Sequence, residues 1–228
     1  VQISRDQMEK GPAYRVINSE YFTVQVNVDE DGNDIIGDAA NETSIAVDPT
    51  NPNRMVIGWR QFNTIGSNFR QAGYGYSTDG GLTWTFPGVL NPGVFRSDPV
   101  LDFDIEGNFY YNSLSVSNND EDISCDIYKI DDGGVLWNEP VPAKGGDKLW
   151  MRLDRTNGIG SGNIYSKWTL GVSDCDGEFT RSTDSGDSFE DCITVDDAPF
   201  WGTMAVDAEG ALYICGRSGY GSDFTVIK

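Results

Sequence analysis

The chain has 228 residues and no histidine, and its 36 acidic side chains outnumber 16 basic ones, which gives a formal net charge of −20. So acidic a protein is a poor partner for nucleic acid or for an anionic membrane surface, and it has no apolar run long enough to span a bilayer. The lack of histidine excludes Ser-His-Asp and Cys-His catalysis within these residues and removes a common zinc ligand. We expect neither a metal nor another cofactor.

Residues 1–40 form an N-terminal segment ahead of a repetitive region. Apolar and polar residues alternate from Tyr21 to Val28, which predicts a strand. The acidic run 29–34 superficially resembles a calcium loop, but it lacks the sixth-position glycine and the terminal glutamate of an EF-hand. We interpret this run as a solvated acidic turn.

From residue 44 onward, a strand–turn–strand unit recurs four times. Each copy begins with an apolar strand that ends in aspartate, continues through a turn, and enters a second apolar strand. The intervals between the strand-ending aspartates are 56, 50 and 53 residues. These aspartates are Asp48, Asp104, Asp154 and Asp207.

A second motif, Ser-x-Asp-x-Gly-x-x-aromatic, follows about 30 residues after three of those aspartates. Its aspartate can accept hydrogen bonds from nearby backbone amides, its glycine permits a positive φ, and its aromatic ring can cover the turn. The motif therefore predicts a self-supporting hairpin tip with a structural role. Its members are Asp79, Gly81 and Trp84 in the first copy, Asp132, Gly134 and Trp137 in the second, and Asp184, Gly186 and Phe189 in the third.

The two motifs together define a unit of about 50 residues that contains four strands. A repeat of this period is typical of solenoids and propellers. No long segment shows an apolar period of 3.6 residues, so we expect almost no helix.

Three copies of the Ser-x-Asp motif at regular spacing resemble the boxes of the Asp-box, or BNR-repeat, β-propellers. These propellers are the architecture of sialidases and their relatives, and the resemblance covers about residues 40–228. The resemblance implies an all-β propeller of four-stranded antiparallel blades at 41–92, 93–144, 145–197 and 198–228, the last one incomplete. A propeller must close its ring, so three and a half to four blades imply a longer protein of six or seven blades, with the remaining blades beyond residue 228. The strand at 21–28 is then the candidate to complete the last blade.

The four cysteines contain no Cys-x-x-Cys pair, which argues against a zinc cluster. Cys175 and Cys192 flank the third box and could form a disulfide across one hairpin; buried free thiols are the alternative. Cys125 and Cys215 fall in non-adjacent blades and are not expected to pair. A disulfide suits an oxidising compartment, and a secreted or extracellular location, or a periplasmic one, fits the resemblance.

In propellers of this type the boxes lie on the face away from the central site, so the loops at the opposite ends of the strands become the candidate site. These loops hold seven of the 16 basic residues and four of the six tryptophans. Arginine forks bind carboxylates or sulfates and indoles stack on sugar rings, which predicts a site for an anionic glycan; ordinary loop charges and core-capping tryptophans are the alternative. The predicted substrate-binding residues are Arg60, Arg96, Lys148, Trp150, Lys167, Trp168, Trp201 and Arg217, with Trp59, Arg70 and Lys144 nearby.

Three carboxylates, six or seven positions before strand-ending aspartates, are candidates for catalysis: Glu42, Asp98 and Asp147. Glycoside hydrolases use such carboxylates in pairs. Asp98 lies close to Arg96, and Asp147 lies beside Lys148, which favours a base or ligand-orienting role. Glu42 has no cationic neighbour in the sequence and is the first choice as proton donor.

The resemblance implies a secreted, sialidase-like glycoside hydrolase that acts on anionic glycans, and the alternative is a non-catalytic propeller that binds glycan or protein. The aromatic-Arg-Ile-Pro motif of sialidases is absent. The nearest stretch, Tyr14-Arg15-Val16-Ile17, lacks the proline and precedes the first blade, so Arg15 is left out of the predicted site. The tyrosine nucleophile and its glutamate partner would come from later blades.

Overall fold

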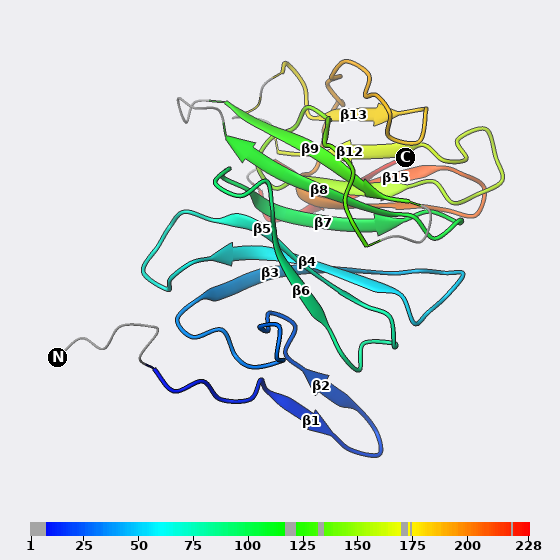
Figure 1. Ribbon diagram of the computed structural model, residues 1–228. Helices are drawn as coiled ribbons and strands as arrows, with labels where there is room; N and C mark the ends of the chain where they lie inside the picture. The colour runs from blue at the N-terminus through cyan, green and yellow to red at the C-terminus, as the bar shows by residue number, and fades with distance from the viewer. Residues whose placement is uncertain (1–7, 117–121, 132–134, 170–172, 174, 220) are drawn as a thin grey trace.

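The computed structural model describes residues 8–116, 122–131, 135–169, 173, 175–219 and 221–228. In this part of the chain the regular structure consists of strands, with no helix, which confirms the all-β class. Figure 1 shows the strands gathered into successive antiparallel sheets.

Four sheets take their strands in chain order, so each one is a meander. The first contains β3 (Ala39–Val47), β4 (Met55–Phe62), β5 (Gln71–Ser77) and β6 (Thr85–Leu90); the second contains β7 (Ser97–Phe103), β8 (Phe109–Val116), β9 (Ile123–Ile130) and β10 (Val141–Pro142). The third contains β11 (Trp150–Leu153), β12 (Ile164–Lys167) and β13 (Phe179–Ser182); the fourth contains β14 (Phe200–Val206), β15 (Leu212–Arg217) and β16 (Phe224–Ile227).

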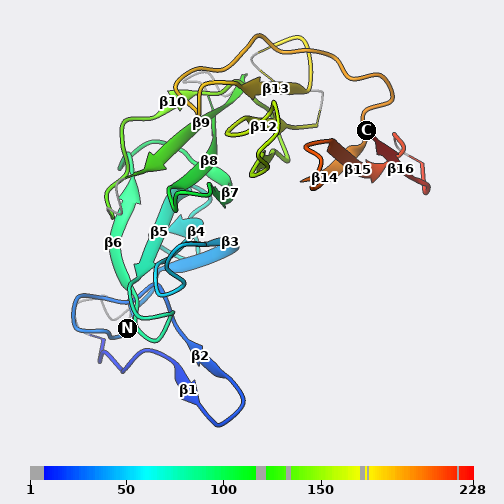
Figure 2. The ribbon, with the colours of Figure 1, turned by 90° about the vertical axis from the view of Figure 1, so that its right-hand side faces the viewer.

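The first strand of each sheet lies next to the first strand of the following sheet, in the order β3, β7, β11 and β14. The sheets spread outward from this row along a curved path (Figure 2). This is how blades are arranged in a β-propeller. Within the described residues the path stays open, with the fourth sheet and the N-terminal hairpin at opposite ends (Figure 2).

The N-terminal strand is shorter than the prediction of 21–28. β2 covers Phe22–Val24 and pairs with β1 (Arg15–Ile17) as a two-stranded hairpin. Beyond β2 the chain bends, because the amide of Val28 donates to the carbonyl of Val26 at 3.0 Å, a contact too local for an extended strand. The ring-closing role of this strand stays a prediction.

The third sheet has three described strands where four were predicted. After β13 the chain returns beside that strand without forming a regular strand: the amide of Glu190 donates to the carbonyl of Arg181 at 2.9 Å, and Ile193 forms a bridge with Phe179. A disulfide joins Cys175 to Cys192 in this segment, so one of the two alternatives for these cysteines is present, while Cys125 and Cys215 remain thiols. A cross-linked loop therefore occupies the place of a regular outer strand.

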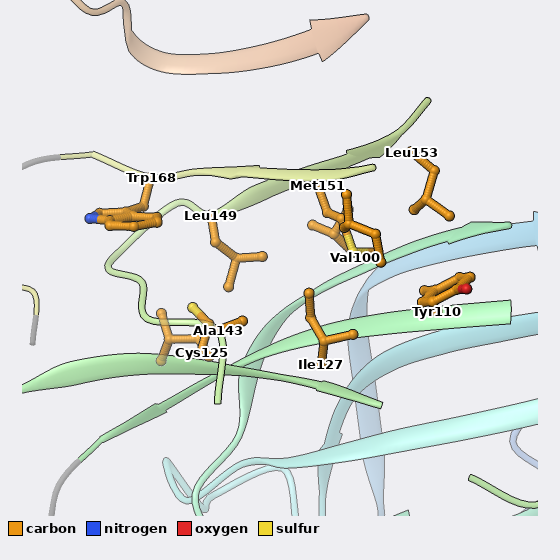
Figure 3. Close-up of a cluster of buried hydrophobic side chains, with 11 residues drawn as sticks. Val100, Tyr110, Cys125, Ile127, Ala143, Leu149, Met151, Leu153 and Trp168 are labelled. Carbon is orange, nitrogen blue, oxygen red and sulfur yellow. The ribbon is translucent and has the colours of Figure 1, made fainter. Parts of the chain in front are cut away.

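Apolar side chains fill the spaces between successive sheets. In the largest cluster, Val100 and Ile127 of the second sheet pack with Met151 and Leu153 of the third (Figure 3). Burying each such side chain contributes about 2 kcal/mol. A polar contact reinforces this boundary, because the buried carboxylate of Asp102 on β7 accepts a hydrogen bond of 3.0 Å from the backbone amide of Leu153.

The described copies of the Ser-x-Asp motif form the predicted turns. The carboxylate of Asp79 accepts hydrogen bonds from the backbone amide and the hydroxyl of Thr83 at 2.9 and 2.6 Å, and Gly81 has a φ of +84°. Asp184 repeats these contacts with Ser188 at 2.9 and 2.5 Å. These hydrogen bonds lower the pKa of both aspartates to about 2. In the second copy, Asp132 and Gly134 lie outside the described residues.

Candidate functional site

In or just before the first strand of each sheet, one residue has the left-handed backbone conformation. Their φ angles are 52° at Glu42, 46° at Asp98, 56° at Lys148 and 49° at Trp201. Each residue stands six positions before a strand-ending aspartate. In β3, β7 and β14 the register with the second strand shifts at this point, which marks a bulge.

This conformation is unfavourable for residues other than glycine, and it costs roughly 1–2 kcal/mol at each position. Backbone strain of this kind is retained where the surrounding structure enforces it, often at binding sites. Its recurrence at one repeat position indicates that the fold enforces it in every sheet. The bulges turn these side chains out of the regular strand alternation.

The four residues line one pocket of about 320 Å³ at the ends of the first strands, which we call the central pocket. It therefore draws one strained residue from each of the four sheets. The full lining is Glu42, Thr43, Asp98, Pro99, Val100, Lys148, Leu149, Trp150, Trp201 and Gly202.

Glu42 is paired with a cation, contrary to the premise on which it was chosen as proton donor. Its Oε1 lies 2.8 Å from Nη2 of Arg60 on β4, and the Nε of Arg60 donates to Asn41 at 2.8 Å. Neighbours along the chain do not reveal this pair, whereas the hairpin places Arg60 opposite Asn41, next to Glu42. The reason for choosing Glu42 as the proton donor therefore no longer holds.

Asp98 also has partners, but not the expected one. Its Oδ1 accepts a hydrogen bond of 2.6 Å from the hydroxyl of Ser97, and its Oδ2 lies 3.8 Å from Nζ of Lys148. Arg96 turns away, because its guanidinium pairs with Asp126 at 2.6 Å and lies over the ring of Tyr128. Arg96 is 4 % exposed and does not line the central pocket, which corrects its assignment to the substrate-binding set.

Two indoles supply the apolar walls of the central pocket. Trp201 is 53 % exposed, and the guanidinium of Arg217 lies 5.4 Å from its ring centroid. Trp150 is half-buried, and its Nε1 is enclosed without a hydrogen-bond partner among the described residues. An exposed ring beside charged groups suits a ligand with one apolar face and several polar groups.

Lys167 and Trp168 do not reach the central pocket, contrary to expectation. Lys167 is 1 % exposed, its ammonium donates to the carbonyl of Pro199, and burial lowers its pKa. Trp168 is fully buried, packs beside Leu149 in the core (Figure 3), and donates through Nε1 to the carbonyl of Gly177 at 3.0 Å. These two side chains follow the alternative interpretation, in which they belong to the structural core.

Other predicted residues also lie outside the central pocket lining. The side chain of Asp147 is exposed, and its backbone carbonyl accepts a hydrogen bond of 2.9 Å from the amide of Thr169. Trp59 is buried and donates to Gln61 at 2.6 Å, while Arg70 lies over the ring of Phe95. Sequence reasoning missed Thr43, Pro99, Val100, Leu149 and Gly202, which carry no charge or large aromatic ring to signal them.

Within the described ranges, no group of three or more acidic, cysteine or histidine side chains could hold a metal ion. No helix of sufficient length and hydropathy to cross a membrane occurs in the same part of the chain.

No family model matches this sequence, and no curated protein matches it either. Among solved structures, the chain is similar to the Hadza microbial sialidase Hz136, with a TM-score of 0.59 and 11 % identity over 91 % of this chain and 46 % of that one. It is also similar to a protein of unknown function from Dyadobacter fermentans DSM 18053, with a TM-score of 0.56 and 14 % identity over 84 % of this chain and 68 % of that one. At such identities the likeness shows a shared fold, and this chain spans less than half the length of the sialidase.

Proposed function

We propose that the central pocket binds a sugar unit of an anionic glycan, as the active site of a sialidase-like glycoside hydrolase. One observation carries the proposal: the repeat delivers two carboxylates, an ammonium and an exposed indole from four different sheets into one pocket. Pockets that bind small molecules combine an apolar lining with a few converging polar groups in this way. The fold shared with a sialidase is consistent with this function.

The roles follow from the surroundings of each side chain. The indole of Trp201 supplies a face for a sugar ring, and Trp150 forms the wall beside it. Lys148, which is half-exposed and only 3.8 Å from Asp98, can turn its ammonium to the acidic group of the sugar. Arg60 supplies a second positive charge, next to Glu42.

Asp98 and Glu42 each lie beside a cation, Lys148 and Arg60 respectively, and we assign them a supporting role. In this role they orient sugar hydroxyls and stabilise the positive charge that develops on the sugar ring during cleavage. We assign the proton donor and the nucleophile to further blades of the six- or seven-bladed ring that the resemblance implies. The disulfide favours an oxidising compartment, and we propose that the protein is secreted or periplasmic.

The alternative is a propeller that binds a glycan without cleaving it. One observation favours it: both carboxylates of the central pocket have cationic partners, so neither is set apart as an acid. Both functions predict that the protein binds an anionic glycan, and only the hydrolase cleaves it.

A panel of fluorogenic glycosides of sialic acid, glucuronic acid and galacturonic acid, assayed with the full-length protein, tests the proposal. We expect turnover of at least one of them, and a loss of about 100-fold or more in kcat for Asp98→Asn, because the variant lacks the charge that stabilises the transition state. Glu190→Gln, which removes an exposed carboxylate paired with Arg181, is the matched control. Binding without turnover favours the second candidate, and neither binding nor turnover contradicts both.

A further inference from the structure

A second pocket, of about 210 Å³, lies between the third and fourth sheets, and we call it the side pocket. It adjoins the central pocket, because Phe200 lines the side pocket while the next residue, Trp201, lines the central one. The two rings lie 4.9 Å apart, and the amide of Trp201 donates to the hydroxyl of Thr169 in the side pocket wall. The full lining is Trp168, Thr169, Glu178, Thr194, Val195, Ala198, Pro199 and Phe200.

One carboxylate in this lining has only one of its two oxygens hydrogen-bonded among the described residues. Glu178 is 3 % exposed, and its Oε1 accepts a hydrogen bond of 2.7 Å from the amide of Val195. Its Oε2 is buried and has no hydrogen-bond partner among the described residues. A buried carboxylate oxygen in this state costs free energy, and a ligand hydroxyl that donates to it would remove that cost.

The walls of the side pocket are held together covalently. Glu178 stands three residues after Cys175, and Val195 stands three residues after Cys192, the two cysteines of the disulfide. Between them, the amide of Glu178 donates to the carbonyl of Ile193 at 3.2 Å. The disulfide and this hydrogen bond keep Glu178 and Val195 in place on opposite segments.

The surroundings of Glu178 select a neutral donor over a cation. The buried ammonium of Lys167 acts electrostatically on Glu178 and already supplies positive charge to this region. Val195, Ala198 and Phe200 supply apolar parts of the walls, and Thr169 and Thr194 also line the side pocket. A ring with one apolar face and a hydroxyl group at its edge satisfies both the walls and the carboxylate, and sugars have this chemistry.

We propose that the side pocket is a second sugar subsite, in which Oε2 of Glu178 accepts a hydrogen bond from a hydroxyl of the unit next to the one in the central pocket. The ligand is then an oligosaccharide that crosses the Phe200–Trp201 pair. This inference rests on the proposed function of the central pocket.

Calorimetric titration of the full-length protein with two ladders of probes tests it: sialic acid and sialyllactose, and galacturonic acid with its di- and trisaccharide. We expect the longer member of one ladder to bind about tenfold or more tightly than its monosaccharide, the worth of one hydrogen bond to a charged group. Glu178→Gln keeps an oxygen to accept the hydrogen bond from the amide of Val195, but it replaces Oε2 by an NH₂ group, which donates. It should remove this gain and leave the monosaccharide affinity unchanged.

Glu190→Gln is the control, because it alters an exposed carboxylate of the same sheet region. Val195→Phe, which narrows the side pocket and leaves Glu178 intact, provides an independent variant and should remove the same gain. Equal affinity for short and long probes, or an undiminished gain in both variants, overturns the second subsite while the central site stands. If the wild-type protein binds no member of either ladder, the proposed function fails, and the second subsite fails with it.

Discussion

Asp98 of β7 and Lys148, which precedes β11, face each other across the boundary between the second and third sheets, with 3.8 Å between Oδ2 and Nζ. They are 50 residues apart in the sequence and occupy the same position of successive repeats. Both have a left-handed backbone, with φ angles of 46° and 56°. The repeat therefore builds a charged pair from two equivalent positions.

Lys148→Gln should weaken the binding of an anionic sugar. The substitution removes the ammonium that we assign to the acidic group and leaves a side chain of similar length. We expect the dissociation constant for sialic acid or galacturonic acid, whichever binds, to rise about tenfold. Lys10→Gln is the matched control, because Lys10 is also paired with an aspartate, at 2.9 Å, in the N-terminal segment. Equal effects of the two variants would contradict the role of Lys148.

Strain at the same position predicts an ordering of two variants. Glycine adopts a positive φ without a steric penalty and alanine does not. Lys148→Gly should therefore unfold with a free energy about 1 kcal/mol higher than Lys148→Ala, as measured by urea titration. An alanine variant that is the more stable of the two would show that the backbone at Lys148 is not strained.

The box aspartates predict a pH dependence of stability. Hydrogen bonds depress the pKa of Asp79 and of Asp184 to about 2 from an ordinary value of 3.8. Their stabilising contribution is fully present above pH 4 and is lost as the pH falls toward 2, because the unfolded chain then binds more protons.

Urea titrations between pH 5 and pH 2 should show the free energy of unfolding falling with pH in the wild type. The fall should be smaller in Asp184→Asn. Asp187→Asn, in the same turn, serves as the control and should behave as the wild type. An unchanged fall in Asp184→Asn would contradict the assignment.

The disulfide predicts a redox dependence. Cys175 and Cys192 are 17 residues apart, and closing a loop of this length stabilises a protein by about 3 kcal/mol. Reductant should lower the free energy of unfolding by about this amount, with no effect of the reductant in Cys175→Ser. Cys215→Ser, which leaves the disulfide intact, should keep the wild-type response to reductant.

The repeat alone identifies four residues of the candidate site. Counting six positions back from each strand-ending aspartate finds Glu42, Asp98, Lys148 and Trp201, which the structure brings into one pocket. A count of six or seven positions back retains Asp147 beside Lys148 among the predicted residues. Both residues precede β11, where strand alternation does not yet assign a face to either one.

The register of the β3–β4 hairpin indicates the ion pair of Glu42. Val47 pairs with Met55 at the closed end of the β3–β4 hairpin. Extending that antiparallel register along the strands sets Glu42 opposite Arg60. Hairpin register, unlike proximity along the chain, identifies such partners.

The burial of Lys167 and Trp168 had no comparable signal. Lys167 ends β12 and Trp168 follows it, where the repeat predicts exposed loop positions. Both side chains are covered by later segments of the chain, which they contact at Pro199 and Gly177. The course of those segments depends on the disulfide and on packing between sheets, which the repeat pattern does not encode.

A crystal structure of the full-length protein soaked with sialyllactose, and another with trigalacturonate, tests the central claim most directly. The account predicts a sugar ring against Trp201 in the central pocket, with its carboxylate on Lys148, in at least one of the two structures. Sugar bound only elsewhere on the molecule, or a central pocket without sugar in both structures at saturating concentration, would contradict it.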